Sequence, residues 1–432
     1  MTSKILCLLL LLPSVICAQT ITGVSGTIED GESITITGSG FGATGTPGPM
    51  GWNKFDNGSD GEVIGYAGND SNWVGYNGAN TTVYSWCLAG QYGAGGDLTL
   101  PDDLPSGMDQ EVFFPTYSDS FARIAGSLSL RREYWHEDVY SIDCDTCGNS
   151  WGRPGENAAS IFFQGMNGVN ENFYASFWIR CSSKADMDQS ANSDRYIRNM
   201  KIISRGRPDL NRCGYWEMSG GAQARTDKAS ISPACSDSVQ TPPNVNDWGA
   251  PRLPDAGAWN RIEFFIDEGS IYGRETIFMW KDGAGTGAMN TNGDGGPLSD
   301  NQSGDGCIGG KLKLGYYHTW NTDDLGTQMW RAIYFDDVYV DSTQARVELG
   351  NDVSFDDCTH REIQIPTSWG DTSIGATINA GTFVADDEVY LFVVDREGNV
   401  SGGYELTMGG EGPPGGGTIA PCDSVWVEDG GG

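Results

Sequence analysis

The stretch Trp259-Asn-Arg-Ile-Glu-Phe-Phe-Ile266 is a short run rich in apolar and aromatic residues, bounded by Gly257 and Asp267. Runs of this kind between turn-forming residues are typical of β-strands. Similar runs recur along the chain, at Ser33–Thr37, Phe173–Ile179, Thr276–Trp280, Lys311–Tyr317, Arg331–Val340 and Val389–Val394. A sustained helical period is almost absent, so the sequence predicts an all-β protein made of sandwiches.

The composition limits the classes of partner. Among 432 residues there are 62 Gly, 58 acidic residues and 26 Lys or Arg, which gives a formal net charge of −32. Nucleic acids and anionic lipids are bound by clustered cations, so this balance argues against both as partners. With 38% hydrophobic residues the chain can form a core, and its length suits one large β domain and a smaller one.

The first residues are typical of an export signal. Lys4 precedes the apolar run Ile5–Leu12, and small or turn-forming residues follow up to Ala18. The apolar run is far shorter than the roughly 20 residues that span a bilayer. We therefore expect residues 1–18 to be a signal peptide, no membrane span, and a secreted or cell-surface protein. Lipidation of Cys17 is the alternative.

Cysteine usage fits export. An exported protein should hold most of its cysteines in disulfides. Nine follow residue 18: Cys87, Cys144, Cys147, Cys181, Cys213, Cys235, Cys307, Cys358 and Cys422. The odd count leaves one free or intermolecular, and Cys422 is the candidate, so self-association through Cys422 or through edge strands is expected. Cys144 and Cys147 form a lone CxxC, which favours a structural disulfide over a zinc or redox site.

Two distant segments carry a shared pattern. Residues 21–42 contain a glycine turn, an alternating strand and the ending Gly-Ser-Gly-Phe-Gly42, and they resemble the opening of an IPT/TIG immunoglobulin-like domain. The family positions are filled by Gly31, Ile34, Ile36, Gly38, Phe41 and Gly42. Ser368-Trp-Gly-Asp-Thr-Ser-Ile374 resembles the later SWSDTSI corner of that family. We expect a split domain of residues 19–49 and 355–409, followed by a flexible tail, residues 410–432; two independent fragments are the alternative.

The intervening residues 50–354 resemble the concanavalin A-like jelly roll of lectins, laminin-G-like modules and polysaccharide lyases. The resemblance is carried by Trp259–Phe265, by Ile277-Phe-Met-Trp-Lys-Asp-Gly283 and by Tyr334-Phe-Asp-Asp-Val-Tyr-Val-Asp341. The resulting fold class is a large jelly-roll sandwich with a small Ig-like sandwich formed from both chain ends. Such a fold says little about activity.

One strand carries a weaker likeness to jelly-roll alginate lyases. Lys311-Leu-Lys-Leu-Gly-Tyr-Tyr-His-Thr-Trp320 is similar to the YFKAGVYNQ strand of those enzymes, with Lys313, Gly315 and Tyr317 in matching places. In the family the second tyrosine transfers a proton during β-elimination beside a uronate carboxylate. The resemblance thus implies Tyr317, with His318 adjacent, at the reaction centre. His318 replaces the family's asparagine.

The cations that such chemistry needs fall in few places. Proton abstraction beside a carboxylate builds an enolate-like charge, which cations stabilise. Arg131-Arg132-Glu133 loosely resembles the family's Arg-x-Glu strand, while Asn199 and Lys201 stand where the family has Gln-x-His. We expect one strand face to hold Tyr196, Arg198, Met200 and Ile202, and the other to hold Ile197, Asn199, Lys201 and Ile203. Three basic strands on one face would focus an anionic glycan, whereas pairing with surface carboxylates is the plain alternative.

Our candidate catalytic residues are therefore Tyr317, His318 and Lys201. The candidate substrate-binding residues are Arg131, Arg132, Arg198, Lys313 and Trp320. Asp336 and Asp337 are adjacent, so we expect them to face opposite ways, and they cannot form a glycosidase carboxylate pair. No cofactor is certain from the sequence. Ca²⁺ is the one candidate, with Asn290, Asn292 and Asp294 as weak ligands in a loop that lacks the usual glutamate.

The sequence favours an exported carbohydrate-binding protein whose partner is a polysaccharide, most consistent with an acidic one. It also suggests a polysaccharide lyase that cleaves uronate glycans by β-elimination. The alternative is a non-catalytic extracellular adhesin or a structural filament protein, which the incomplete lyase motif and the odd cysteine count favour.

Overall fold

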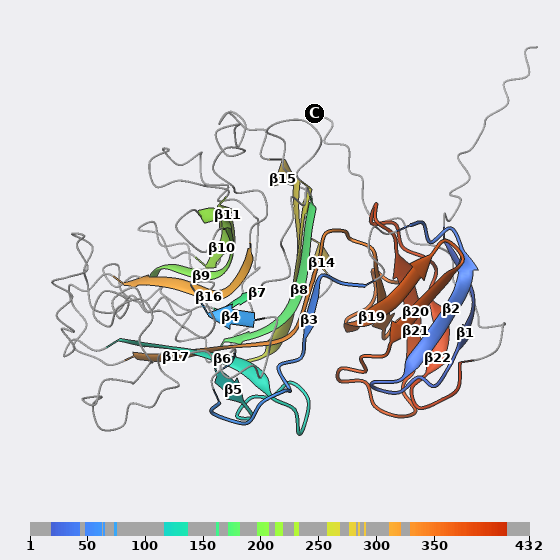
Figure 1. The fold of residues 1–432 in the computed structure, drawn as a ribbon, viewed down its shortest axis with the longest axis horizontal. Coiled ribbons are helices and arrows are strands. Elements are labelled where there is room, and N and C mark those ends of the chain that lie inside the picture. Colours follow the sequence, from blue (N-terminus) through green and yellow to red (C-terminus); the bar gives the residue numbers. More distant parts are fainter. Residues whose placement is uncertain are drawn as a thin grey trace, which may run out of the picture. The chain divides into compact units, whose positions relative to one another are not determined.

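The computed structural model describes residues 19–43, 48–62, 64, 73–75, 116–136, 161–163, 172–181, 197–206, 212–218, 229–232, 257–267, 276–281, 284–285, 289–290, 311–320 and 329–412. The elements of this part are all β-strands, joined in antiparallel pairs (Figure 1). The predicted all-β sandwich class is therefore confirmed. No described helix has the length and apolar character needed to cross a membrane.

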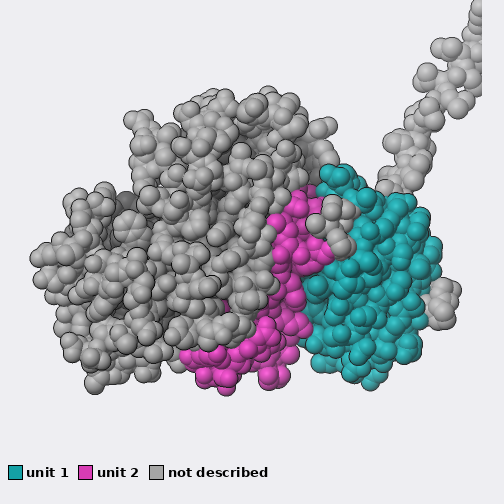
Figure 2. Space-filling model, in the orientation of Figure 1, with its two compact units in different colours: residues 1–47, 345–425 teal, residues 48–344, 426–432 magenta. Residues whose placement is uncertain are grey.

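The chain divides into two compact units (Figure 2). The small unit comprises residues 1–47 and 345–425, and the large unit comprises residues 48–344 and 426–432. Strands from both parts of the small unit belong to one sheet, because β2 (Ser33–Ser39) pairs with β20 (Ser373–Thr377). The assignment of this unit to the IPT/TIG family, the signal peptide and the tail all stay predictions, and residues 1–18 and 413–432 lie outside the described residues.

The small unit is built on a seven-stranded arrangement in the order β1-β2-β20-β19-β18-β21-β22. Its remaining strands are β1 (Thr20–Ser25), β18 (Arg346–Gly350), β19 (Arg361–Gly370), β21 (Glu388–Val394) and β22 (Tyr404–Thr407). The first part of β19 pairs with β18 and the second part with β20. This strand therefore links the two halves of the sandwich.

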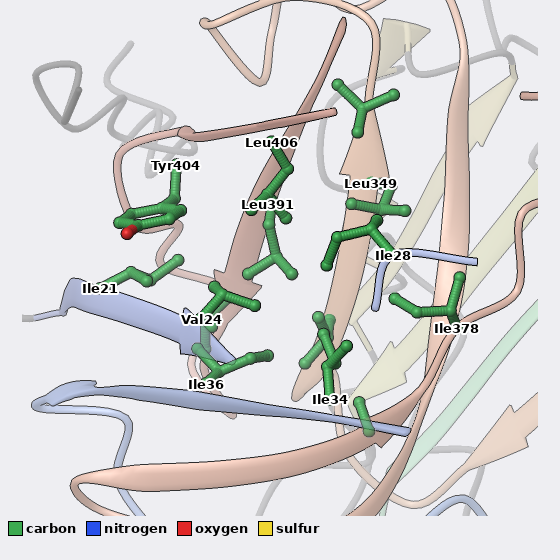
Figure 3. Packing of buried hydrophobic residues seen from close by; sticks show 14 of the residues in the cluster. Ile21, Val24, Ile28, Ile34, Ile36, Leu349, Ile378, Leu391, Tyr404 and Leu406 are labelled. Carbon is green, nitrogen blue, oxygen red and sulfur yellow. The ribbon is translucent and has the colours of Figure 1, made fainter. Parts of the chain in front are cut away.

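Alternation explains the core of the small unit. In β2, Ile34 and Ile36 are buried while Ser33, Thr35 and Thr37 are exposed, as the period of two requires. Their side chains join those of β18, β21 and β22 in one aliphatic core (Figure 3). The members are Ile21, Val24, Ile28, Ile34, Ile36, Phe41, Val347, Leu349, Ile374, Ala376, Ile378, Ala380, Val389, Leu391, Val393, Tyr404, Leu406 and Met408.

The two quoted motifs of this unit meet. The indole Nε1 of Trp369 donates to the Phe41 carbonyl at 3.2 Å, and the Phe41 amide donates to the Asp371 carbonyl at 3.1 Å. Gly38 is required here, because a Cβ at this position would collide with the Thr20 carbonyl and the Phe41 ring. Hydrogen bonds thus join residues that are more than 300 positions apart in the sequence.

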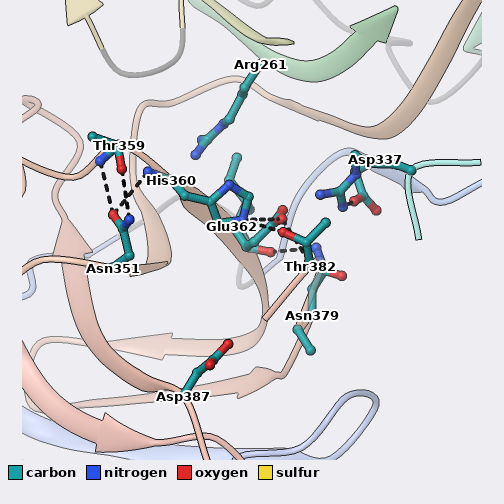
Figure 4. A network of polar contacts seen from close by, with 12 residues as sticks. Arg261, Asp337, Asn351, Thr359, His360, Glu362, Asn379, Thr382 and Asp387 are labelled. Carbon is teal, nitrogen blue, oxygen red and sulfur yellow. Dashed lines mark hydrogen bonds and ion pairs between the residues drawn. The ribbon is translucent and has the colours of Figure 1, made fainter. Parts of the chain in front are cut away.

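A buried polar network lies at one end of the small unit. The Glu348 carboxylate is fully buried and accepts from Arg346 Nε at 2.5 Å and from Arg361 Nε at 3.0 Å. Nearby, His360 Nε2 lies 2.9 Å from Glu362 Oε1 and 3.0 Å from Thr382 Oγ1 (Figure 4). The imidazole of His360 is therefore held in place by Glu362 and Thr382 of the small unit.

Cys358 changes the cysteine assignment. It is a free, buried thiol whose Sγ donates to the Ser354 carbonyl at 3.3 Å. Burial raises the pKa of this thiol to about 11, so it stays protonated at neutral pH. Cys358 is thus a second candidate for the odd cysteine besides Cys422, which lies outside the described residues.

The large unit contains two sheets. The six-stranded sheet has the order β11-β10-β9-β16-β7-β4. These strands are β4 (Trp73–Gly75), β7 (Ile161–Phe163), β9 (Ile197–Gly206), β10 (Arg212–Met218), β11 (Ala229–Ser232) and β16 (Lys311–Trp320).

The nine-stranded sheet follows the path β14-β13-β12-β8-β17-β6-β5, with β15 paired to β13 and β3 paired to β17. Its strands are β3 (Gly51–Asn53), β5 (Thr116–Ser118), β6 (Ser129–His136), β8 (Asn172–Cys181), β12 (Trp259–Asp267), β13 (Thr276–Lys281), β14 (Ala284–Gly285), β15 (Met289–Asn290) and β17 (Met329–Asp341). One face is apolar: Phe177, Ile179, Ile262 and Phe335 are all buried, and the rings of Phe177 and Phe335 lie 5.9 Å apart.

Candidate functional site

The strands of two predicted clusters are neighbours in the six-stranded sheet. β9 pairs with β16, and in this register Tyr317 lies opposite Lys201 and His318 opposite Met200. Lys313 lies opposite Ser204, and Trp320 opposite Ile197. Residues 116 positions apart in sequence are therefore brought to one register position. The chemical roles assigned to these residues stay predictions.

The alternation predicted for β9 is interrupted. Register shifts fall between Leu314 and Tyr317 and between Thr319 and Trp320, and on β9 they leave Ile202 and Arg198 without register partners on β16. A second shift, against β10, also falls at Ile202. The regular alternation predicted here is therefore wrong for Ile197–Ile203, because bulges change the order in which residues meet each face, and Tyr196 lies outside the described residues.

The third basic cluster belongs to the other sheet. β6 pairs with β17, so that Arg131 lies opposite Tyr334 and Arg132 opposite Ile333 in the nine-stranded sheet. The three basic strand regions therefore do not form one sheet face. The sequence does not predict that β6 belongs to the other sheet, because β6 is placed by its pairing with β17. No local pattern in residues 129–136 specifies that pairing.

The second face of the nine-stranded sheet is rich in charge, and we call it the charged face. Its rows follow from the register: Asp336, Trp178 and Arg261 are cross-strand neighbours, as are Tyr334, Arg180 and Trp259. Glu263 lies opposite Ser176 in a third row. With Arg123 from the turn between β5 and β6, the charged face comprises Arg123, Trp178, Arg180, Arg261, Glu263, Asp336 and Asp337.

Arg123 bridges two adjacent carboxylates. Its side chain is 2% exposed, lies 3.8 Å through Nε from Asp336 Oδ2, and forms an ion pair through Nη2 with Asp337 Oδ2. The guanidinium carbon lies 4.7 Å from the centre of the Trp178 ring. Both acids thus share one cation, which makes the cluster a structural ion network rather than an acid and base pair.

The expectation that Asp336 and Asp337 face opposite ways is wrong. Asp337 has a positive φ of 46°, and the pairing of β17 with β8 shifts register between Asp336 and Tyr339. A residue in the left-handed region breaks the alternation of a strand, so both carboxylates reach Arg123. The signal in the sequence is the Asp-Asp pair itself, since Asp tolerates this conformation better than most residues.

Further along the charged face, Arg261 and Glu263 form a second ion pair. Arg261 Nη2 donates to Glu263 Oε1 at 3.1 Å, and Arg261 Nε donates to Ser176 Oγ at 3.0 Å. The hydroxyl of Tyr174 donates to the same Glu263 oxygen at 2.6 Å. Arg261 and Tyr174 therefore converge on one oxygen of Glu263.

Asp341, at the end of β17, is a buried carboxylate with a strongly shifted pKa. Burial raises its pKa from 3.8 to about 7, although the Ser342 amide donates to Oδ1 at 2.6 Å. It is 3% exposed. Asp341 belongs to β17, not to β9 or β16 with the predicted reaction centre, so we expect its ionisation to affect the stability of the large unit.

The predicted Ca²⁺ site stays a prediction. In the part of the chain that the structure describes, no group of three or more His, Cys, Asp or Glu side chains could hold a metal ion. Asn290 is the last residue of β15 and lies opposite Thr276, while Asn292 and Asp294 lie outside the described residues.

Comparison with protein families finds no family model that matches the chain, and no curated protein matches it. Among solved structures, alginate lyase Aly36B is 12% identical, covering 62% of this chain and 95% of that one, with a TM-score of 0.29. Alginate lyase vAL-1 from Chlorella virus is 12% identical over 52% and 89%, with a TM-score of 0.29. The GH131 β-glucanase catalytic domain from Podospora anserina is 10% identical over 50% and 72%, with a TM-score of 0.27.

Proposed function

We propose that this protein is an exported carbohydrate-binding protein that binds an acidic polysaccharide along β9 and β16 and cleaves it by β-elimination. The observation that supports the proposal is the pairing of Tyr317 with Lys201 in register. Opposed residues on antiparallel strands belong to the same face of a sheet. A proton carrier and a cation at one position are the minimum that the reaction requires.

The reaction assigns a role to each group. Either Tyr317 takes the proton from the carbon beside the uronate carboxylate while water protonates the leaving oxygen, or Tyr317 protonates the leaving oxygen while His318 takes the carbon-bound proton. The carbon–oxygen bond to the next sugar then breaks, a carbon–carbon double bond forms, and the leaving oxygen ends as a hydroxyl. Lys201 offsets the negative charge that builds on the carboxylate side, and Lys313, which precedes Tyr317 on β16, belongs to the same cationic stretch.

The charge of the whole chain makes local cations important. With a net charge of −32 the body of the protein repels an anionic polymer, so binding needs a local concentration of Lys and Arg. β9 and β16 contain Arg198, Lys201, Arg205, Lys311 and Lys313, which is a large share of the 26 bases of the chain for two neighbouring strands.

The experiment measures cleavage directly. The full chain is incubated with alginate, with glucuronan and with a neutral glucan, and the ultraviolet absorbance of the unsaturated product is followed. We expect a signal with uronates alone, and a loss of about 10²–10⁴-fold in Tyr317→Phe. Tyr316→Phe is the matched control, because it removes the neighbouring hydroxyl of the same strand.

The outcomes separate the parts of the proposal. Activity equal to wild type in Tyr317→Phe contradicts the role of Tyr317. Binding of a uronate polymer without any unsaturated product assigns a binding protein or adhesin in place of a lyase. His318→Gln decides whether the imidazole beside Tyr317 takes part, since its removal then shifts the pH profile of cleavage.

A further inference from the structure

Phe121 is an exposed aromatic residue held in a fixed position. It lies in the turn between β5 and β6 and is 43% exposed, which is unusual for a large apolar side chain in the described part of this protein. Its ring meets Tyr334 edge to face with centres 5.2 Å apart. Since Tyr334 is 3% exposed, Phe121 rests on a buried base. The ring therefore presents an apolar surface to solvent.

Arg180 lies next to this ring, and its guanidinium packs over the ring. Its guanidinium carbon is 4.5 Å from the centre of the Phe121 ring, and its Nε is inaccessible and has no hydrogen-bond partner. Among the described residues no carboxylate forms an ion pair with Arg180, whereas on the same face Arg123 pairs with two carboxylates and Arg261 with one. Within the described part of the chain, this half-buried arginine thus differs from the other arginines of the charged face.

The register places further suitable groups beside this pair. Tyr334 separates Arg180 from Arg131 on one side, and Trp259 is the cross-strand neighbour of Arg180 on the other. Trp259 is partly exposed. Arginines bind carboxylates through two parallel hydrogen bonds, and aromatic rings pack against the C–H faces of sugars. The row thus combines a cation with aromatic surface.

We propose that Phe121 and Arg180 form a binding subsite for a negatively charged sugar residue on the charged face of the nine-stranded sheet. Arg180 would bind the carboxylate, and the Phe121 ring would pack against the sugar. This subsite belongs to a different sheet from β9 and β16. It rests on the proposed binding of an acidic polysaccharide but not on its cleavage.

The test measures binding in the absence of cleavage. Full-length protein carrying Tyr317→Phe is titrated by calorimetry with alginate oligosaccharides and with neutral glucan oligosaccharides of equal length. Adding Arg180→Ala should raise the Kd for the uronate oligosaccharide about tenfold or more, because a charge-assisted hydrogen bond is lost. Phe121→Ala should raise it severalfold. Arg396→Ala, which removes an arginine that is 64% exposed, should leave the Kd unchanged.

A conservative variant guards against misfolding. Arg180→Lys keeps the charge and should lose less affinity than Arg180→Gln, provided that both melt like the parent protein. An unchanged Kd in Arg180→Ala, or an equal loss for neutral and uronate oligosaccharides, overturns the subsite. A sulfated oligosaccharide that depends on Arg180 while alginate does not would reassign the anion from carboxylate to sulfate and overturn the uronate assignment.

The two proposals fail separately. If wild type cleaves uronates and Arg180→Ala does so with the same KM, the subsite is wrong and the lyase stands. If no substrate is cleaved but binding depends on Arg180, the lyase is wrong and the subsite stands.

Discussion

The small and large units each contain a buried sheet face, but the two faces are filled by different chemistry. The core of the small unit consists almost entirely of aliphatic side chains that follow the alternation of their strands. The charged face of the large unit is filled by arginines, carboxylates and aromatic rings, and Arg123 and Arg261 are paired there with carboxylates. In an aliphatic face, the stability lost on a substitution grows with the volume of the cavity that it leaves. In an ionic face, the loss of stability is largest when one partner of a buried ion pair is removed.

The largest effect is expected from Arg123→Ala. This change leaves Asp336 and Asp337 buried without the cation that they share, so the free energy of unfolding of the large unit should fall by about 3–5 kcal/mol. Calorimetry of the full chain measures it as a shift of one of the transitions. Arg123→Met combined with Asp336→Asn and Asp337→Asn should regain most of the loss. If the triple variant is as unstable as Arg123→Ala, charge matching is not the reason for the loss.

Asp341 provides a pH test of the same unit. Its folded pKa of about 7 lies above the unfolded value of 3.8, because burial disfavours the charged form. Its contribution to stability is therefore fully present below pH 3.8 and is lost as pH rises to about 7, by up to about 4 kcal/mol. Asp341→Asn cannot ionise and should flatten this part of the profile. Denaturant titrations between pH 4 and pH 8 measure the difference, and parallel profiles would contradict the assignment.

Leu391→Ala tests the aliphatic side of the comparison. Leu391 is fully buried in β21, and its truncation leaves a cavity that should cost the small unit about 3 kcal/mol. Leu391→Met keeps the volume and should cost under about 1.5 kcal/mol. Unlike the pH effect at Asp341, this loss should be the same at pH 5 and pH 8. A strong pH dependence would mean that the buried Glu348 network is coupled to the core.

The smallest effect is expected from Arg396→Ala. Arg396 and Glu397 form an ion pair in which both side chains are 64% exposed. Water and salt screen such a pair, so the free energy of unfolding should change by less than about 0.5 kcal/mol. Thermal melts in low and high salt measure it. A loss comparable to that of Arg123→Ala would remove the distinction between buried and exposed charges.

The extent to which sequence predicts this protein follows the same division. The strands around Ile34, Phe265 and Val393 were predictable, because alternating or short apolar runs between turn residues mark strands. The convergence of Asp336 and Asp337 on Arg123 was not, since it depends on a left-handed residue and a register shift. The sheet that holds Arg131 was not predictable either, because a strand does not specify its neighbours.

The candidate site shows both situations. The motif of β16 drew attention to Tyr317, and the motif of β9 to Lys201, but their register partnership is a property of the sheet. Phe121 and Arg180 carry no motif at all, and only the geometry of the turn after β5 brings them together. The one relevant signal in the sequence is the scarcity of Lys and Arg, which total 26 in this chain. An arginine without an acidic residue next to it in the sequence is therefore a candidate for a binding role.

The pairing of β2 with β20 has a consequence for synthesis. Phe41 leaves the ribosome 328 residues before Trp369, and its carbonyl later accepts a hydrogen bond from the Trp369 indole. At a rate on the order of 5–20 residues per second, the β1–β2 hairpin waits tens of seconds for its neighbouring strand. During that time Ile34 and Ile36 have no core to enter, and an unpaired strand invites association with other chains. The outward Ser33, Thr35 and Thr37 are therefore the residues on which the solubility of the growing chain depends.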